Sequence, residues 1–315
     1  MKISVTGASG FLGRHTIPVL QSRYGDENVL ALSSKDYTLI DRAQVAKMFI
    51  NTKPDVLVHL AAYSGGIGIN RAKPADFYFI NIMMQALVFE EAARYGKLKK
   101  LVYPMGGCSY PATAISPIDE SQMWQGYPQN ESAGYSAAKK MGIVASRSYL
   151  TQYGLKTSVI IPGNMYGEYD NFRNAESHVI PAFIRRYHEE ILTGADKIVM
   201  WGTGAPQRDF VYAGDVAALI PYFIEEYDSV EPVNISTGTC ISIKELAETL
   251  KQAFHFTGEI VWDRDKPDGQ LVKIFDVSRL KGLGLSCPTS LAEGLSKTIP
   301  WFQAHYESRS DALRL

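Results

Sequence analysis

The chain has 315 residues, of which 46% are hydrophobic and 21% charged, and this composition excludes a disordered or fibrous protein. With 32 Lys and Arg against 33 Asp and Glu, the formal net charge is −1, so no bulk charge favours nucleic acid or an anionic membrane. Three cysteines are too few for a disulfide framework and indicate a reducing, cytoplasmic location. We expect neither a transmembrane helix nor a signal peptide, because no apolar run is long enough and the N-terminus enters a strand pattern directly.

Short β-branched runs alternate with helical patterns through the first half of the chain, which is typical of βαβ units. The pattern predicts strands at 2–6, 29–32, 56–60, 100–103 and 157–161, and helices at 11–20, 41–49, 75–95 and 133–152. After residue 162, long loops rich in Gly, Asn and aromatics separate further regular patterns at 209–212, 216–226, 232–235 and 243–254. Long ordered loops usually belong to a site.

The fold class predicted from this order is α/β: a Rossmann-type doubly wound parallel sheet with a smaller α/β substrate-binding lobe. We expect residues 1–162 to form the nucleotide-binding domain, with parts of 209–236 returning to it. Residues 163–208 and 237–315 would then form the substrate-binding lobe.

Gly7, Gly10 and Gly13 stand at spacings of three between the first predicted strand and the first predicted helix. In dinucleotide-binding folds such glycines allow a tight turn, a close approach of the pyrophosphate and close helix packing, and the helix N-terminus attracts phosphate. NAD(H)-binding sites usually have a carboxylate at the end of the second strand to bind the ribose 2′-OH, but here the chain has Ser33, Ser34 and Lys35, with no carboxylate until Asp36. These residues favour NADP(H) over NAD(H), although Lys35 could also be an ordinary solvated lysine.

Tyr135 and Lys139 lie four residues apart on a predicted helix and therefore share one face. A lysine cation beside the phenol is expected to lower the tyrosine pKa from about 10, so that the phenol can exchange a proton with a carbonyl or an alcohol. Taken alone, this spacing of Tyr and Lys occurs frequently by chance. Together with the glycine motif, it indicates a short-chain dehydrogenase/reductase.

The chain resembles the extended short-chain dehydrogenase/reductases of the NAD-dependent epimerase/dehydratase family, on the segments TGASGFLG, HLAA, YSAAK, RDFVYAGDVA and NISTG. More narrowly it resembles the GDP-L-fucose synthase group, which are 3,5-epimerase/4-reductases of GDP-4-keto-6-deoxymannose. That resemblance spans roughly residues 1–300 and is carried by CSYP, NMYGEYDNF, SHVIPAFIRRYH, WGTGAPQRDF and KPDG. It implies a GDP-sugar substrate, NADP(H) as cofactor and a homodimer.

By this resemblance, Tyr135 donates a proton to the C4 oxygen and Lys139 holds the nicotinamide ribose. Cys108 and His178 match the base and acid that exchange protons at C3 and C5, which are acidic because they lie α to the 4-keto group. Without the resemblance, Cys108 would be read as a small core residue and His178 as a loop histidine.

The resemblance also implies further contacts with the cofactor, beyond the three glycines, Lys139 and the residues after the second strand. They come from Ser9, Phe11, Leu12, Leu39, Ala61, Ala62, Asn81, Pro104, Gly106, Pro162, Asn164, Met165 and His178. The substrate contacts that it implies come from Cys108, Asn164, Arg186, Trp201, Arg208 and Asp268. The two arginines suit a diphosphate because the guanidinium donates two parallel hydrogen bonds. No metal site is expected.

One position departs from the family pattern. The serine or threonine that normally hydrogen-bonds the sugar O4 and the tyrosine hydroxyl is replaced by Gly106, followed by Gly107. Loss of one such donor can cost about 10²-fold in rate. Ser109 would need a rearranged strand end to take over this role.

Three hypotheses therefore remain open. The chain is a GDP-sugar epimerase/4-reductase, or an epimerase or 4-reductase with altered chemistry or a different substrate such as a heptose, or a non-catalytic binding protein. For the homodimer we expect the helices at 75–95 and 133–152 to pair, with Ala138, Met141, Val144 and Ala145 as an apolar outer stripe.

Overall fold

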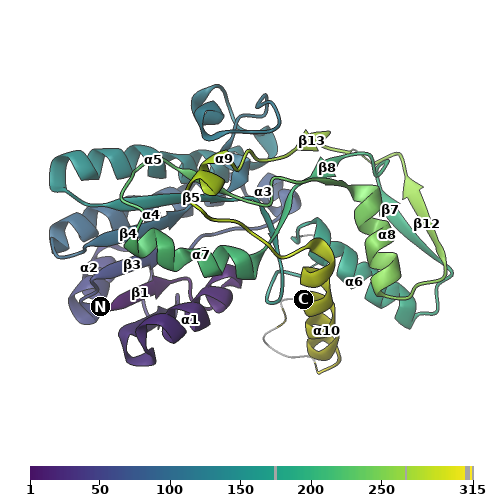
Figure 1. The fold of residues 1–315 in the computed structure, drawn as a ribbon, viewed down its shortest axis with the longest axis horizontal. Coiled ribbons are helices and arrows are strands. Elements are labelled where there is room, and N and C mark those ends of the chain that lie inside the picture. Colours follow the sequence, from purple (N-terminus) through teal and green to yellow (C-terminus); the bar gives the residue numbers. More distant parts are fainter. Residues whose placement is uncertain (174–175, 267, 309–312, 314–315) are drawn as a thin grey trace.

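Six parallel strands form the central sheet of the larger lobe in the computed structural model, which describes residues 1–173, 176–266, 268–308 and 313 (Figure 1). In spatial order they are β10 (Val233–Ile235), β5 (Thr157–Pro162), β4 (Lys100–Pro104), β3 (Val56–His59), β1 (Ile3–Thr6) and β2 (Val29–Leu32). The order reverses between β1 and β3, so the carboxyl ends of these two strands border the crevice where such sheets bind ligands. The predicted Rossmann-type sheet is confirmed.

Helices cover both faces of this sheet (Figure 1). One face carries α1 (Phe11–Tyr24) and α7 (Ala213–Glu225); the other carries α2 (Arg42–Thr52), α4 (Pro74–Tyr95) and α5 (Ala133–Tyr153). Side chains alternate across β3, because Val56 and Val58 pack with α1 and α7 whereas Leu57 packs with α2 and α4. The two apolar clusters hold the sheet between two helical layers.

The smaller lobe, on the right in Figure 1, has an apolar cluster of its own that includes Phe172, Ile184 and Phe302. Its helices are α6 (Val179–Leu192), α8 (Ile243–Ala253) and α10 (Leu291–Glu307). Its strands are β7 (Lys197–Trp201) with β12 (Glu259–Asp263), and β8 (Gln207–Arg208) between β11 (Ile241–Ser242) and β13 (Val272–Lys273). The short helices α3 (Ile67–Ala72) and α9 (Ser278–Gly282) flank the larger lobe, and Leu280 of α9 packs in the cluster with α1 and α7.

Asp209 ties together the segments that cross between the lobes. It lies between β8 and β9 (Phe210–Tyr212), which pairs with β6 (Asn164–Tyr166). Its buried carboxylate accepts hydrogen bonds from the Thr237 hydroxyl (2.6 Å), the Gly238 amide (3.1 Å) and the Phe275 amide (3.4 Å). The Asn164 side chain donates to the Asp209 carbonyl (2.9 Å). One residue thus connects four segments that are distant in sequence.

The predicted apolar outer stripe of α5 is only partly present. Val144 is 47% exposed, whereas Ala138 is 0% exposed. Six residues at 3.6 per turn place these two side chains about 120° apart on the helix, so they cannot share one narrow face. The prediction for Ala138 is wrong. Among the helices that the structure describes, none is long and apolar enough to span a membrane.

Candidate active site

The glycine turn after β1 has the shape that a dinucleotide pyrophosphate requires. Gly7 has a φ of +72°, and a Cβ there would lie 2.6 Å from the Ala61 amide nitrogen at the end of β3. A Cβ on Gly13 would lie 2.3 Å from the Gly7 carbonyl oxygen. The N-cap of α1 is Gly10, whose position lacks a side-chain cap, and the first turn contains no acid. Its amide groups are therefore open to a phosphate, and these residues fit a nicotinamide dinucleotide.

The other predicted cofactor residues gather mainly at the carboxyl ends of the strands. Phe11 and Leu12 begin α1, and Asn164 and Met165 lie in β6. Pro104 and Pro162 are the last residues of β4 and β5. The residues that follow β2 are Ser33, Ser34 and Lys35, and those that follow β3 are Ala61 and Ala62. Two of the predicted cofactor residues also have structural contacts. Leu39 is buried in the cluster with α2 and α4. Asn81 is buried and uses its amide to hold Tyr63 (3.0 and 2.9 Å) and the Phe77 carbonyl (2.7 Å).

Tyr135 and Cys108 both lie close to Gly106, where the absence of a side chain leaves room for them. A Cβ on Gly106 would lie 3.2 Å from the Cys108 sulfur and 3.6 Å from the Tyr135 hydroxyl oxygen. Burial, and then the charge of a Cys108 thiolate, raise the pKa of Tyr135 above its ordinary value. The lowering of this pKa that the sequence predicts from Lys139 is therefore absent, because desolvation of the phenolate dominates. Tyr135 is a protonated phenol at neutral pH.

Lys139 is buried beneath the tyrosine, on the same face of α5. Its Nζ lies 4.1 Å from the ring centroid of Tyr103, and burial lowers its pKa to about 7. The Tyr103 hydroxyl donates to Gln85 (2.6 Å) and to the Lys139 carbonyl (3.3 Å). A Cβ on Gly142, the next turn of α5, would lie 2.2 Å from this ring. Tyr103 is thus a fixed platform for the lysine that the sequence did not suggest.

His178 is the N-cap residue of α6 and is exposed. The segment before it is held by the Gly66 amide, which donates to the Glu176 carbonyl (2.7 Å), and by close packing of Gly66 against the Ser177 carbonyl (2.7 Å from a Cβ). Although part of its surface is accessible to solvent, protein atoms surround the His178 imidazole and lower its pKa by desolvation, so the ring is neutral at pH 7.

Gly107 differs from Gly106 in what surrounds it. A Cβ on Gly107 would lie 2.4 Å from Cζ of Phe275, so this ring occupies the place of a side chain. Ser109 is fully buried, with its amide bonded to the Gly106 carbonyl (2.9 Å). Its hydroxyl is enclosed and makes no hydrogen bond to any residue that the structure describes.

Three of the predicted substrate residues, Arg186, Trp201 and Asp268, lie on the smaller lobe. Trp201 is exposed, with the guanidinium of Arg186 5.6 Å and the ammonium of Lys266 5.8 Å from its ring. The Asp268 carboxylate holds the turn after Trp201 by accepting from the Thr203 amide (2.6 Å) and hydroxyl (2.7 Å). Cations beside an aromatic face suit a nucleotide base and its phosphates.

Arg208 pairs across β8 and β13 with Lys273, a residue that the sequence analysis missed. Burial lowers the pKa of the Lys273 ammonium; the negative charge of a Cys108 thiolate opposes this shift and the Arg208 guanidinium adds to it. Burial also lowers the pKa of Arg208. The positive charges of Arg208 and Lys273 repel each other in partly buried surroundings. A bound anion would relieve this repulsion, so the pair is suited to bind one.

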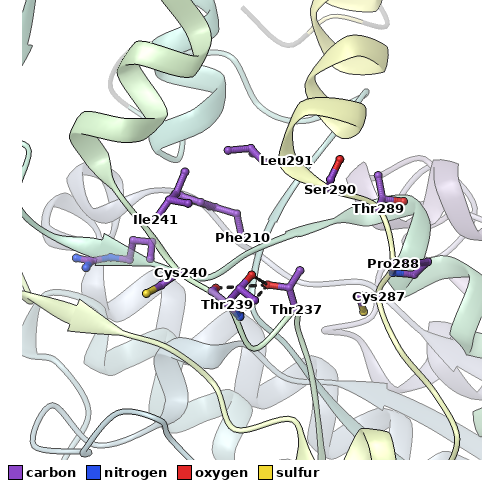
Figure 2. Close-up of a pocket in the computed structure, with 11 residues that line it drawn as sticks. Phe210, Thr237, Thr239, Cys240, Ile241, Cys287, Pro288, Thr289, Ser290 and Leu291 are labelled. Carbon is purple, nitrogen blue, oxygen red and sulfur yellow. Dashed lines mark hydrogen bonds between the residues drawn. The ribbon is translucent and has the colours of Figure 1, made fainter.

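A cavity of about 260 Å³ lies behind Arg208, where α10 meets the segments after β10 (Figure 2). It is lined by Arg208, Phe210, Thr237, Thr239, Cys240, Ile241, Cys287, Pro288, Thr289, Ser290 and Leu291. None of the predicted catalytic residues lines this cavity, so it is separate from the space around Gly106. Among the residues that the structure describes, no three metal-ligating side chains cluster closely enough for a metal ion.

The sheet, the glycine turn and the Tyr135–Lys139 pair define an extended short-chain dehydrogenase/reductase. The chain belongs to the NAD dependent epimerase/dehydratase family, which matches residues 3–236. Within that family, the chain is similar to GDP-sugar epimerases and reductases. GDP-L-fucose synthase 1 of Arabidopsis thaliana is 37% identical over 301 residues, covering 96% of this chain and 93% of the relative.

Two solved structures resemble the fold over nearly its whole length. A GDP-6-OMe-4-keto-L-xylo-heptose reductase from C. jejuni has a TM-score of 0.86 at 27% identity and covers 98% of both chains. A GDP-L-fucose synthetase from Naegleria fowleri, solved bound to NADP, has a TM-score of 0.87 at 27% identity. That match covers 99% of this chain and 96% of the other.

Proposed function

We propose that this protein uses NADPH to convert a GDP-4-keto-6-deoxyhexose by epimerisation at C3 and C5 and reduction at C4. The observation that carries the proposal is that the Cys108 thiol and the Tyr135 phenol both lie close to Gly106, with their sulfur and oxygen atoms 3.2 and 3.6 Å from the position of a Cβ there. A sugar bound against Gly106 would meet a proton-exchanging group and a proton donor together.

The residues divide the chemistry as follows. Tyr135, kept protonated by its raised pKa, donates to the C4 oxygen as negative charge develops there. Cys108 and His178 exchange protons at C3 and C5. Arg186, Arg208 and Lys273 hold the diphosphate. Bound NADPH supplies the hydride for C4, and Lys139, buried at the base of the site, holds the nicotinamide ribose.

The experiment that tests this function follows both half-reactions on one substrate. Purified protein is given GDP-4-keto-6-deoxymannose in D₂O, with and without NADPH, while deuterium at C3 and C5 and oxidation of NADPH are measured. We expect exchange in both samples and oxidation only in the second. Tyr135→Phe should lose reduction at C4 and keep exchange at C3 and C5. Cys108→Ser should lose exchange and still reduce a substrate that has already been epimerised. Deuterium exchange without oxidation of NADPH would indicate that the protein is an epimerase only. If neither exchange nor oxidation is observed, the protein is a non-catalytic binding protein.

A second candidate function is 4-reduction of a larger GDP-linked sugar, and the absence of a side chain at Gly106, beside Cys108 and Tyr135, favours it. Among the similar structures is a reductase of a GDP-linked 4-keto-heptose. A GDP-4-keto-heptose that is reduced faster than the 6-deoxyhexose would support this function over the first.

We also propose a homodimer formed through α4 and α5. Tyr78 and Phe79 of α4 and Val144 of α5 are large apolar side chains exposed on these neighbouring helices. Exposed apolar side chains that gather on adjoining elements are typical of subunit interfaces.

A further inference from the structure

A groove of about 420 Å³ lies between the start of α1 and the end of β2. It is lined by Ala8, Ser9, Arg14, Ile17, Pro18, Ala31, Leu32, Ser33 and Tyr169. In dinucleotide-binding sheets the adenosine ribose 2′ position lies at the end of the second strand, beside the glycine turn. Arg14 is the single charged residue among those that line the groove.

The Arg14 side chain is held in place at this groove. Its Nε donates to the Ser9 carbonyl (3.2 Å), which fixes the guanidinium beside the glycine turn. The guanidinium carbon lies 5.3 Å from the ring centroid of Tyr169, and that ring also contacts Trp301 of α10 (4.9 Å). The terminal nitrogens of Arg14 make no hydrogen bond to any residue that the structure describes. A guanidinium held in this way is ready to donate two parallel hydrogen bonds to a phosphate.

The residues predicted from the sequence for the 2′-phosphate are placed less well. Both the amide and the hydroxyl of Ser33 donate to the Asp36 carboxylate (2.7 and 2.8 Å), and these bonds lower the pKa of Asp36. Lys35 is exposed, does not line the groove, and donates its amide to the Ser33 hydroxyl (3.2 Å). The end of β2 therefore presents an ionised carboxylate, and a 2′-phosphate there needs a cation from another element.

We infer that Arg14 selects NADP(H) over NAD(H) by binding the 2′-phosphate, with Tyr169 as the residue that positions its guanidinium. This inference rests on the use of NADP(H) in the proposed function. It assigns the cofactor preference to the first helix, which the glycine motif precedes, rather than to the loop after β2.

The test measures binding without catalysis. Dissociation constants for NADPH, NADH, 2′,5′-ADP and 5′-AMP are determined by calorimetry for wild type, Arg14→Gln and Lys35→Gln. Arg14→Gln should weaken NADPH and 2′,5′-ADP at least about tenfold and leave NADH and 5′-AMP within about twofold. Lys35→Gln should change all four by less than about threefold. Tyr169→Leu should weaken NADPH by an intermediate factor, because the guanidinium loses its platform.

The outcomes separate the inference from the function on which it rests. If wild type prefers NADPH but Arg14→Gln weakens NADPH and NADH equally, Arg14 serves the shared part of the cofactor and the inference is overturned. The same holds if Lys35→Gln abolishes the preference. If wild type binds NADH as tightly as NADPH, the proposed cofactor itself is wrong, and Asp36 becomes the partner of a ribose 2′-OH.

Discussion

Phe275 fills the place that a side chain at Gly107 would occupy, with its Cζ 2.4 Å from the position of a Cβ there. The ring is fully buried and its amide donates to Asp209. Of the two adjacent glycines that replace the family's serine, Gly107 is thus explained by packing within the chain. Gly106 alone faces the reacting groups.

We predict that Gly107→Ser is destabilising and Gly106→Ser is nearly neutral. An added Cβ at residue 107 must displace a buried ring, which costs about 1–3 kcal/mol of unfolding free energy. At residue 106 the nearest atoms are the Cys108 sulfur at 3.2 Å and a Tyr135 ring carbon at 3.3 Å, and both side chains need to move by only a few tenths of an ångström. Thermal unfolding of both variants measures the difference. Gly107→Ser combined with Phe275→Leu should recover stability, and failure to recover would contradict the packing explanation.

We predict that Gly106→Ser accelerates 4-keto reduction about tenfold or more if the substrate is a GDP-4-keto-6-deoxyhexose. The new hydroxyl would lie beside the Tyr135 phenol and stabilise the developing oxyanion. Steady-state oxidation of NADPH measures this, and Tyr135→Phe should lower the rate in either background. A slower Gly106→Ser variant would instead mean that the space accommodates a larger sugar.

The buried Lys139 makes a prediction about pH. Its folded-state pKa of about 7 is below the unfolded value of about 10.4, so the unfolded chain binds more protons between these values. This group therefore destabilises the fold at pH 6, and its cost declines as pH rises above 7. Lys139→Met should be more stable than wild type at pH 6, with the difference shrinking by about 2 kcal/mol between pH 7 and 9. Unfolding curves across this range provide the measurement, and a constant difference would argue that Lys139 stays charged.

Lys273 should contribute to binding of the diphosphate. We predict that Lys273→Met weakens GDP binding about tenfold, because one of the three cations proposed to hold the diphosphate is lost and only Arg186 and Arg208 remain. The matched control is Lys281→Met, an exposed lysine on α9, which should leave the affinity unchanged. Calorimetric titration with GDP distinguishes them. Equal effects of the two substitutions would show that only net charge matters.

The dimer proposal predicts that charge on the α4–α5 surface separates the subunits. Phe79→Glu with Val144→Glu should sediment as a monomer at micromolar concentration, because both side chains are about half exposed (55% and 47%) on neighbouring helices. Ile50→Glu is the control, since Ile50 is 64% exposed on α2, away from that surface. Sedimentation of the wild-type protein as a monomer under these conditions would contradict the proposed homodimer.

The sequence predicted the larger lobe well because its signals are local. Buried β-branched runs mark β1 and β3. Asp41, the first residue of the helix predicted at 41–49, accepts a hydrogen bond from the Gln44 amide (2.9 Å) and caps α2. In the smaller lobe α6 was not predicted, since His178 provides no side-chain cap. For α10 a signal existed and was overlooked: Ser290 and Glu293 form a capping box.

The site residues that belong to a sequence motif were predictable. Those that only the tertiary structure brings to the site were not. The spacing of Tyr135 and Lys139 is visible in sequence, but the direction of the Tyr135 pKa shift depends on burial, which the spacing does not contain. Lys273 reaches the site through a strand pairing with Arg208, 65 residues earlier in the chain, and no periodicity indicates such a pairing.

Asp209 has a consequence for how the specificity of this protein can change. Its carboxylate fixes the amides of Phe275 and Gly238, and its carbonyl fixes the side-chain amide of Asn164. A new substrate preference acquired by moving any of these segments would disturb all of them at once. Side-chain replacement on an unmoved backbone, as at Gly106, is the route left open, so specificity in this fold can diversify one residue at a time while the crossing point stays constant.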